Sequence, residues 1–331
     1  MKVAIMHCDL PKSNWYTEIL KKCTYGGLSR QGIGYELFFH GEKLPDPENN
    51  NFDLIDFSEW CNPWHQEVAH AYSLPIICTT AETSVNALSG YLARNKINTG
   101  FMLSRISHFI ARSNWTKYML SGIKINPDNI SVIHYGVDLN LFKPADKEPE
   151  EPAFLYVGSI NMQKGVHHLI NAYLKIMDKT DWKLIICVGE FNNDPKLLRY
   201  IEDLAKKYNK IQLIPFPPIP KLPEIYHKAT CYCFIQDYAC PAQCSNPSIW
   251  AYSCGLPVIS LDTGVLKDYI IHGENGSLCR NVDEIPERML EIAQSDWKEM
   301  GKVSRKIAED NHSPEIIATE YKKVYESVLK V

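Results

Sequence analysis

The sequence lacks any apolar run long enough to cross a membrane. Its longest apolar runs, such as 183–188 and 231–235, have the length of a strand, whereas a membrane-spanning helix needs about 20 apolar residues. The N-terminus also lacks a signal-peptide pattern, because its apolar stretch 3–6 is short and runs into polar residues. Without an export signal we expect the 11 cysteines to stay reduced, which predicts a cytoplasmic protein.

An excess of positive charge is also absent. The chain has 35 Lys and Arg against 39 Asp and Glu, a net charge of −4. A general nucleic-acid binder needs surplus cations to neutralise phosphates, so we expect no such function. With 331 residues, of which 45% are hydrophobic, the chain is long enough for two globular domains.

Short, continuously apolar segments alternate with helix-length periodic segments. Strands that are apolar on both faces and alternate with helices predict an α/β fold with doubly wound parallel sheets. The clearest strand candidates are Val3–Met6, Pro75–Cys78, Ala153–Val157, Leu184–Val188, Cys231–Ile235 and Val258–Ser260. The clearest helix candidates are Val166–Lys175, Leu197–Tyr208, Pro286–Ser295 and Ser313–Val331.

The alternation is interrupted once, at residues 143–152, which read KPADKEPEEP. Prolines and dense charge neither continue a helix nor fit a sheet, so this segment predicts a linker. We therefore expect an N-terminal lobe at 1–145 and a C-terminal lobe at 146–312, with the final helix 313–331 packing back onto the first lobe. Two such Rossmann-like lobes would face each other across a cleft at the carboxyl ends of their strands, where open α/β sheets bind ligands.

Residues 156–166 read YVGSINMQKGV. A strand ends at Val157, a glycine turn follows, and a helix begins near Gly165. Amides at a helix start together with Lys164 suit a diphosphate. The alternative is an ordinary strand-to-helix turn with a solvated lysine, since no Gly-Lys-Ser/Thr phosphate loop follows.

A second segment, 244–260, reads CSNPSIWAYSCGLPVIS. Ser245 or Asn246 can cap a short helix whose first amides, around Ser248, would point into the cleft. Gly255 and Pro257 then give the expected stop signals before the next buried strand.

Residues 254–260 resemble the donor-site signature of family 4 glycosyltransferases, which have the GT-B fold. Residues 132–144, VIHYGVDLNLFKP, resemble the family pattern V-I-x-N-G-V-D-x-x-x-F-x-P, and 155–170 resemble its L-Y-V-G-R-x4-K-G-x-x-x-L-I. Residues 185–190 are similar to its L-x-I-x-G-x-G strand, and 262–278 to the stretch that ends in D-G-x-N-G-L-L. The resemblance covers 104–331, whereas over 1–103 it depends on strand order.

The resemblance implies transfer of a sugar, with retention, from a nucleoside diphosphate sugar to an acceptor hydroxyl. It implies a UDP- or GDP-linked donor, no cofactor and no catalytic metal. The acceptor, a glycan, a lipid-linked molecule or a small molecule, is left open; a lipid-linked one would imply peripheral membrane contact, although no basic amphipathic helix supports it. The donor-binding candidates are Gly158, Ser159, Lys164, Gly189, Glu190, Phe216, Ser245, Asn246, Pro247 and Ser248, and the acceptor-side candidates are Asp9, Trp60 and Thr80.

Several positions depart from the family pattern. Ser159 stands where the family has an arginine, Ala242 and Trp250 where it has acidic residues, and Ala81 where it often has a histidine. Trp250 cannot accept a hydrogen bond from a ribose, because its one polar group is a donor.

These departures leave Glu82, beside Ala81, and Asp237, if the alignment shifts, as the catalytic candidates. They also leave a second function open, that of a degenerate transferase fold acting as a binding or scaffold protein.

Cysteines gather near the second donor segment. Cys231, Cys233, Cys240 and Cys244 could supply four thiolates to zinc. Their spacing is not that of a zinc ribbon, and the first two lie in an apolar strand, so we predict no metal.

Overall fold

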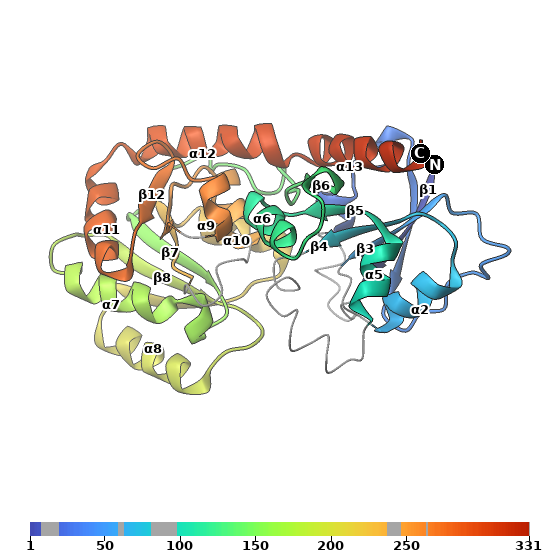
Figure 1. Cartoon of the computed structure of the whole chain (residues 1–331). Coiled ribbons are helices and arrows are strands. Elements are labelled where there is room, and N and C mark those ends of the chain that lie inside the picture. The colour runs from blue at the N-terminus through green and yellow to red at the C-terminus, as the bar shows by residue number, and fades with distance from the viewer. Residues whose placement is uncertain (8–19, 59–62, 81–97, 237–245, 263, 331) are drawn as a thin grey trace. The chain divides into compact units, whose positions relative to one another are not determined.

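The computed structural model describes residues 1–331 apart from 8–19, 59–62, 81–97, 237–245, 263 and 331. The chain folds into two compact units (Figure 1). The first comprises the described residues of 1–136 and 311–330, and the second those of 137–236 and 246–310. Each unit is built on one six-stranded sheet.

The first sheet has the strand order β2-β1-β3-β4-β5-β6, and all neighbouring strands are parallel. Its strands are β1 (Lys2–His7), β2 (Gly34–Phe39), β3 (Leu54–Ser58), β4 (Ile76–Thr80), β5 (Ile106–Ala111) and β6 (Ile130–Val132). Its helices are α2 (Pro63–Ala71), α5 (Thr99–Arg105), α6 (Asn114–Gly122) and α13 (Pro314–Leu329), with short helical turns at Leu20–Thr24, Ser29–Gln31 and Pro127–Asn129.

Apolar side chains cover both faces of this sheet. One face packs against α2, α5 and α6, and the other against α13. Helix α13 buries Ile317, Tyr321 and Tyr325 in the same core as Val3 and Ile5 of β1. The last helix of the chain therefore completes the unit that the first strand begins.

The second sheet has the order β12-β11-β10-β7-β8-β9 and is parallel throughout. Its strands are β7 (Ala153–Gly158), β8 (Lys183–Val188), β9 (Ile211–Pro215), β10 (Cys231–Phe234), β11 (Val258–Leu261) and β12 (Gly276–Cys279). Its helices are α7 (Val166–Ile176), α8 (Pro195–Lys207), α9 (Pro223–Tyr226), α10 (Asn246–Ser253), α11 (Ile285–Gln294) and α12 (Trp297–His312). Short 3-10 turns lie at Met162–Lys164, Ile219–Lys221, Gly264–Asp268 and Val282–Glu284.

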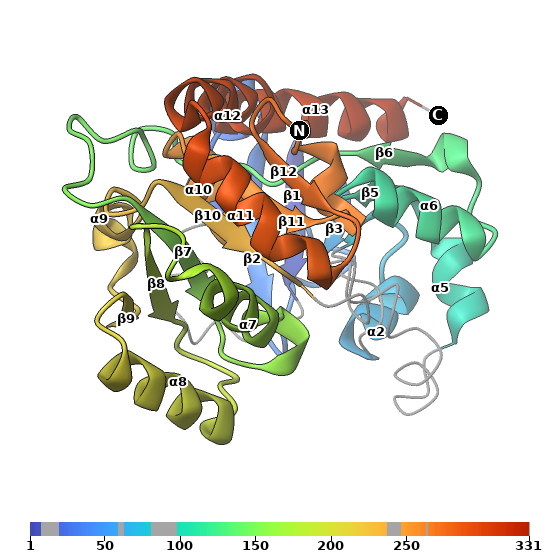
Figure 2. The same cartoon turned by 90° about the vertical axis from the view of Figure 1, so that its left-hand side faces the viewer.

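Helices α7 and α11 lie side by side on one face of this sheet, as Figure 2 shows. Val166, Leu169 and Ile170 of α7 and Met289 and Ile292 of α11 are buried in one core with the strands. This packing holds the start of α7 at the carboxyl ends of the strands, where the first donor segment lies.

The predicted fold class, doubly wound parallel sheets with covering helices, is confirmed, and each predicted strand corresponds to an observed one. The strands that we did not predict have weaker patterns. In β3 the buried Asp56 interrupts the apolar run, and β2 is an edge strand whose side chains are partly exposed. No helix in the described ranges has both the length and the apolar character needed to span a membrane.

Candidate functional site

The carboxyl ends of β7 and β8 meet at two glycines. The Gly189 amide donates a hydrogen bond to the Gly158 carbonyl at 2.8 Å. A Cβ on Gly189 would lie 2.9 Å from the Ser159 nitrogen, a separation that real side chains avoid, so the close approach depends on glycine. Gly158, Ser159, Gly189 and the exposed Glu190, all predicted donor residues, are thereby brought together at one edge of the sheet.

The side chain of Asn193 joins the loops that follow these strands. Its Oδ1 accepts from the Ile160 amide and its Nδ2 donates to the Gly189 carbonyl, both at 2.7 Å. The Asp194 amide completes the connection by donating to the Ile160 carbonyl at 2.7 Å. We did not predict a role for Asn193, since one asparagine in a polar loop carries no periodic signal.

Lys164 ends a short 3-10 turn immediately before α7. Its backbone amide donates to Asn161 Oδ1 at 2.9 Å, so this amide already has an acceptor within the turn. The side chain is half-buried. A lysine held beside a helix N-terminus adds an ammonium to the positive end of the helix dipole.

Gly165 brings this turn onto the neighbouring strand. It has φ +68°, in the left-handed region, and a Cβ there would overlap the backbone carbonyl of Ile235, which follows β10. Glycine is the residue that satisfies both requirements. The N-terminus of α7 is therefore fixed against the carboxyl end of β10.

A buried tyrosine is hydrogen-bonded to the first turn of α10. The Tyr226 hydroxyl donates to the Pro247 carbonyl at 3.0 Å, and Tyr226 is fully buried. Asn246 and Pro247 are half-buried, whereas Ser248 is completely buried and its Oγ has no hydrogen-bond partner among the described residues. The structure does not describe Ser245.

Trp250 packs into the core of the second unit. It is 2% exposed and stacks on Phe142 with 4.9 Å between ring centroids and 2° between ring planes. The position where the family has an acidic residue is thus a packing contact between α10 and the segment before β7. Phe216, the remaining donor candidate, is half-buried directly after β9.

Polar groups also gather in the first unit. Thr80 ends β4, is fully buried, and has no partner for its hydroxyl in the part of the chain that the structure describes. His7 ends β1, and burial, followed by the charge of Arg112, lowers its pKa to about 4. It is therefore a neutral imidazole at pH 7.

A buried carboxyl group and a buried guanidinium lie near these strand ends. Asp56 accepts hydrogen bonds from Thr79 at 2.9 Å and from Tyr325 at 2.7 Å, and burial raises its pKa to about 6. Arg112 is 3% exposed and donates to the carbonyls of Ile133 and His134. We predicted no role for Asp56 or Arg112, because their partners are distant in sequence.

Several predictions fall outside the described residues, namely Asp9, Trp60, Glu82 and Asp237. The cysteine cluster is described only in part, since Cys231 and Cys233 are buried in β10 as free thiols and the other two are outside. In the described ranges, no three His, Cys, Asp or Glu side chains gather as metal ligands would.

A protein-family model and several curated proteins match this chain. The family model "Glycosyl transferases group 1" matches residues 138–310. Spore coat protein SA of Bacillus subtilis is 26% identical over 186 residues, which is 52% of this chain and 48% of that protein. The chain spans about half the length of the first curated relatives it matches.

Solved structures show the same fold over the full chain. Sucrose-phosphate synthase of Thermosynechococcus elongatus superposes with a TM-score of 0.77 and 18% identity, covering 100% of this chain and 99% of that one. The Anabaena protein HepE, in complex with UDP-glucose, superposes with a TM-score of 0.74 and 14% identity, covering 100% of both chains. At these identities the likeness establishes the fold alone.

Proposed function

Since this chain belongs to the group 1 glycosyl transferases and has their GT-B fold, we propose that it transfers a sugar from a nucleoside diphosphate sugar to an acceptor hydroxyl with retention of configuration. In this reaction the bond between the anomeric carbon and the diphosphate oxygen breaks. The acceptor oxygen bonds to that carbon, and negative charge grows on the leaving diphosphate oxygen, which takes up the acceptor's proton.

The observation that carries this proposal is the arrangement around Lys164. Its side chain, the N-terminus of α7 and the glycine ends of β7 and β8 belong to one edge of the second sheet. Preorganised positive charge stabilises the diphosphate most where its charge grows, which is in the transition state. Ser159 adds a hydroxyl but no charge, so Lys164 carries the cationic part of this role.

The nucleotide is proposed to be UDP. The Anabaena relative of the fold is bound to UDP-glucose, and its structure covers the whole of this chain. Glu190 and Phe216 follow β8 and β9, beside the glycine edge, and would contact the nucleoside. On the first unit, Thr80 is the described residue that we propose for the acceptor side.

The test is calorimetric titration of UDP into the wild-type chain and into Lys164→Ala. Loss of a charge-assisted hydrogen bond costs about 2 kcal/mol, or roughly 30-fold in the dissociation constant. Lys175→Ala is the matched control, because Lys175 is an exposed lysine at the other end of the same helix. An unchanged affinity in Lys164→Ala would remove the site assignment.

Turnover is tested separately. A thermal-shift screen with UDP-, GDP- and ADP-sugars finds the donor, and release of nucleoside diphosphate with an acceptor panel measures transfer. Stabilisation by one nucleotide class supports the transferase, whereas no shift across the panel would favour a binding or scaffold protein.

A further inference from the structure

A pocket of about 530 Å³ lies within the second unit, at the edge of the sheet opposite the candidate donor site. Residues 144–149 precede β7, His227 and Ala229 precede β10, and 254–256 precede β11. Because the strands are parallel and β7, β10 and β11 are neighbours, these segments gather at their amino ends. The candidate donor site lies at the carboxyl ends, so the two sites are separate.

Close packing and hydrogen bonds fix the segments around this pocket. Helix α12 passes over the end of α10 at a glycine pair, since a Cβ on Gly301 would overlap the carbonyl of Gly255. Arg305 of α12 donates to the carbonyls of Phe142 at 2.9 Å and Ser253 at 2.8 Å. These bonds hold the chain before β7, the end of α10 and α12 together, so the pocket is preformed.

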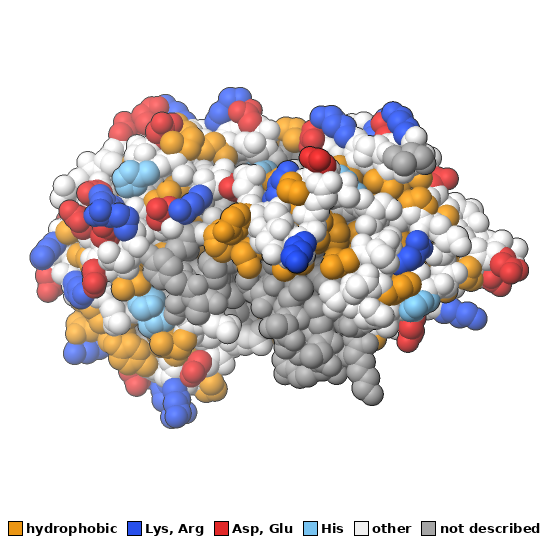
Figure 3. Space-filling view, viewed as in Figure 1, with side chains coloured by type: hydrophobic (Ala, Val, Ile, Leu, Met, Phe, Trp, Pro, Cys, Tyr) orange, Lys and Arg blue, Asp and Glu red, His pale blue; other side chains and the backbone are white. Residues whose placement is uncertain are grey.

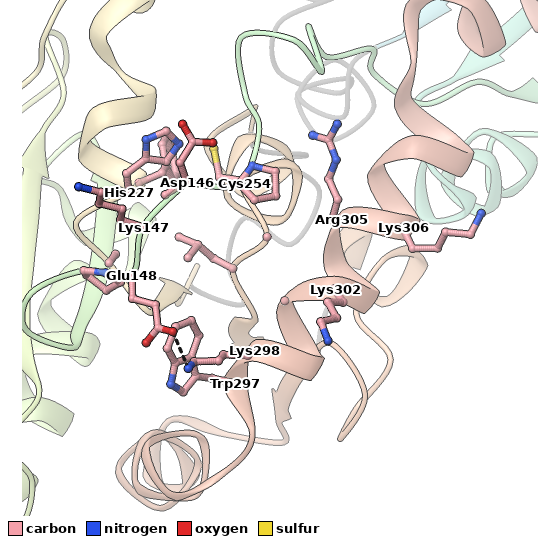
Figure 4. Close-up of a pocket in the computed structure, with 18 of the residues that line it drawn as sticks. Asp146, Lys147, Glu148, His227, Cys254, Trp297, Lys298, Lys302, Arg305 and Lys306 are labelled. Atoms are coloured by element: carbon pink, nitrogen blue, oxygen red, sulfur yellow. Dashed lines mark ion pairs between the residues drawn. The ribbon is translucent and has the colours of Figure 1, made fainter.

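One wall is cationic and the floor is apolar. Lys298, Lys302 and Lys306 stand four residues apart on α12, a spacing that places them on one side of the helix. Figure 4 shows α12 on one side of the pocket, with Lys298 of this helix reaching across to Glu148, whereas Lys147 points away from α12. Trp297 and Leu256 contribute apolar surface to the lining.

The lysines of α12 are held by weak, exposed ion pairs. Lys298 pairs with Glu148 at 2.6 Å, and both side chains are more than half exposed. Lys302 and Lys306 pair with acidic neighbours on their own helix, and Figure 3 shows acidic and basic side chains next to one another over α12. Exposed pairs of this kind contribute about 0–1 kcal/mol, so an incoming anion can attract these ammonium groups.

We propose that this pocket binds a small organic anion. Its aromatic or aliphatic body would lie on Trp297 and Leu256, and its carboxylate or phosphate would be held by Lys302 and Lys298. The pocket volume suits this class, because ligand pockets of drug-sized molecules span about 300–1,000 Å³ and pair apolar walls with a few charged groups.

The probe for this site is anilinonaphthalene sulfonate, an aromatic anion whose fluorescence rises on binding. We expect the folded wild-type chain to bind it, and Lys302→Glu to weaken binding about tenfold through charge reversal. Lys302 is 71% exposed, so this change leaves the fold intact. Lys206→Glu, an equally exposed lysine on α8, is the matched control and should bind as wild type.

A second variant and competitors complete the test. Ala145→Phe fills the pocket and should abolish binding. Phenyl phosphate or benzoate should displace the probe, and the better competitor identifies the preferred acid group. Equal affinity for neutral phenylnaphthylamine or equal binding by wild type and Lys302→Glu would overturn the proposal. Displacement by UDP that Lys164→Ala weakens would also overturn it, because the probe would then occupy the donor site.

Discussion

Replacing Asn193 with alanine should loosen the donor edge without touching a ligand-binding side chain. The change removes two hydrogen bonds of 2.7 Å, one from the Ile160 amide and one to the Gly189 carbonyl. Each is worth about 1 kcal/mol net, so the loops after β7 and β8 should lose about 2 kcal/mol of mutual stabilisation. If UDP binding has to restore that order, its dissociation constant should rise by roughly 30-fold.

The assay combines two measurements on the same protein. Amide hydrogen exchange at Ile160 reports directly on the lost bond, and should accelerate because the amide loses its acceptor. Calorimetry with UDP reports the consequence for binding. Asn193→Asp separates the two bonds, since a carboxylate can still accept from Ile160 but cannot donate to Gly189.

The matched control is Asn192→Gly. Asn192 has φ +57° and takes part in the loop through its backbone carbonyl, which accepts from Asn161 Nδ2. Glycine keeps both features, so UDP affinity should stay unchanged. Wild-type exchange at Ile160 together with wild-type affinity for UDP in Asn193→Ala would show that these two bonds do not order the donor edge.

Two further predictions concern stability. Burial lowers the pKa of His312 to about 3 and that of His7 to about 4, and raises that of Asp56 to about 6. Between pH 4 and 6 the unfolded chain therefore binds two more protons than the folded chain through these histidines and one fewer through Asp56. Through these three groups, the free energy of unfolding should rise by about 1.4 kcal/mol per pH unit. Urea denaturation at pH 4 and 6 should show this slope for wild type and a nearly flat dependence for His312→Asn, whereas equal slopes would contradict the assignment. Gly165→Ala should lower the melting temperature far more than Gly273→Ala. Both glycines have positive φ, but only Gly165 also faces a backbone carbonyl. Similar losses in melting temperature would show that the contact with Ile235 is unimportant.

The layers of this protein follow from the local pattern of its residues. Strands buried on both faces must be continuously apolar, so β1, β4, β7, β8, β10 and β11 were predictable from composition along the chain. The glycine turn at Gly158 and the lysine before α7 were visible for the same reason, because turns and helix starts use local residue types. β3 was not predictable in this way, because Asp56 interrupts its apolar run. The carboxyl group of Asp56 is accommodated by hydrogen bonds from Thr79 and Tyr325, which are distant in sequence.

Which polar groups meet depends on how distant segments of the chain fold together. Asn193 bonds to Ile160 across 33 residues, and Tyr226 holds Pro247 across 21. The pocket beneath α12 gathers segments that no periodicity connects. Which residues are buried follows from the apolar pattern along each segment. Which polar or charged side chains meet depends on the chain segments that the parallel sheet places at the same edge.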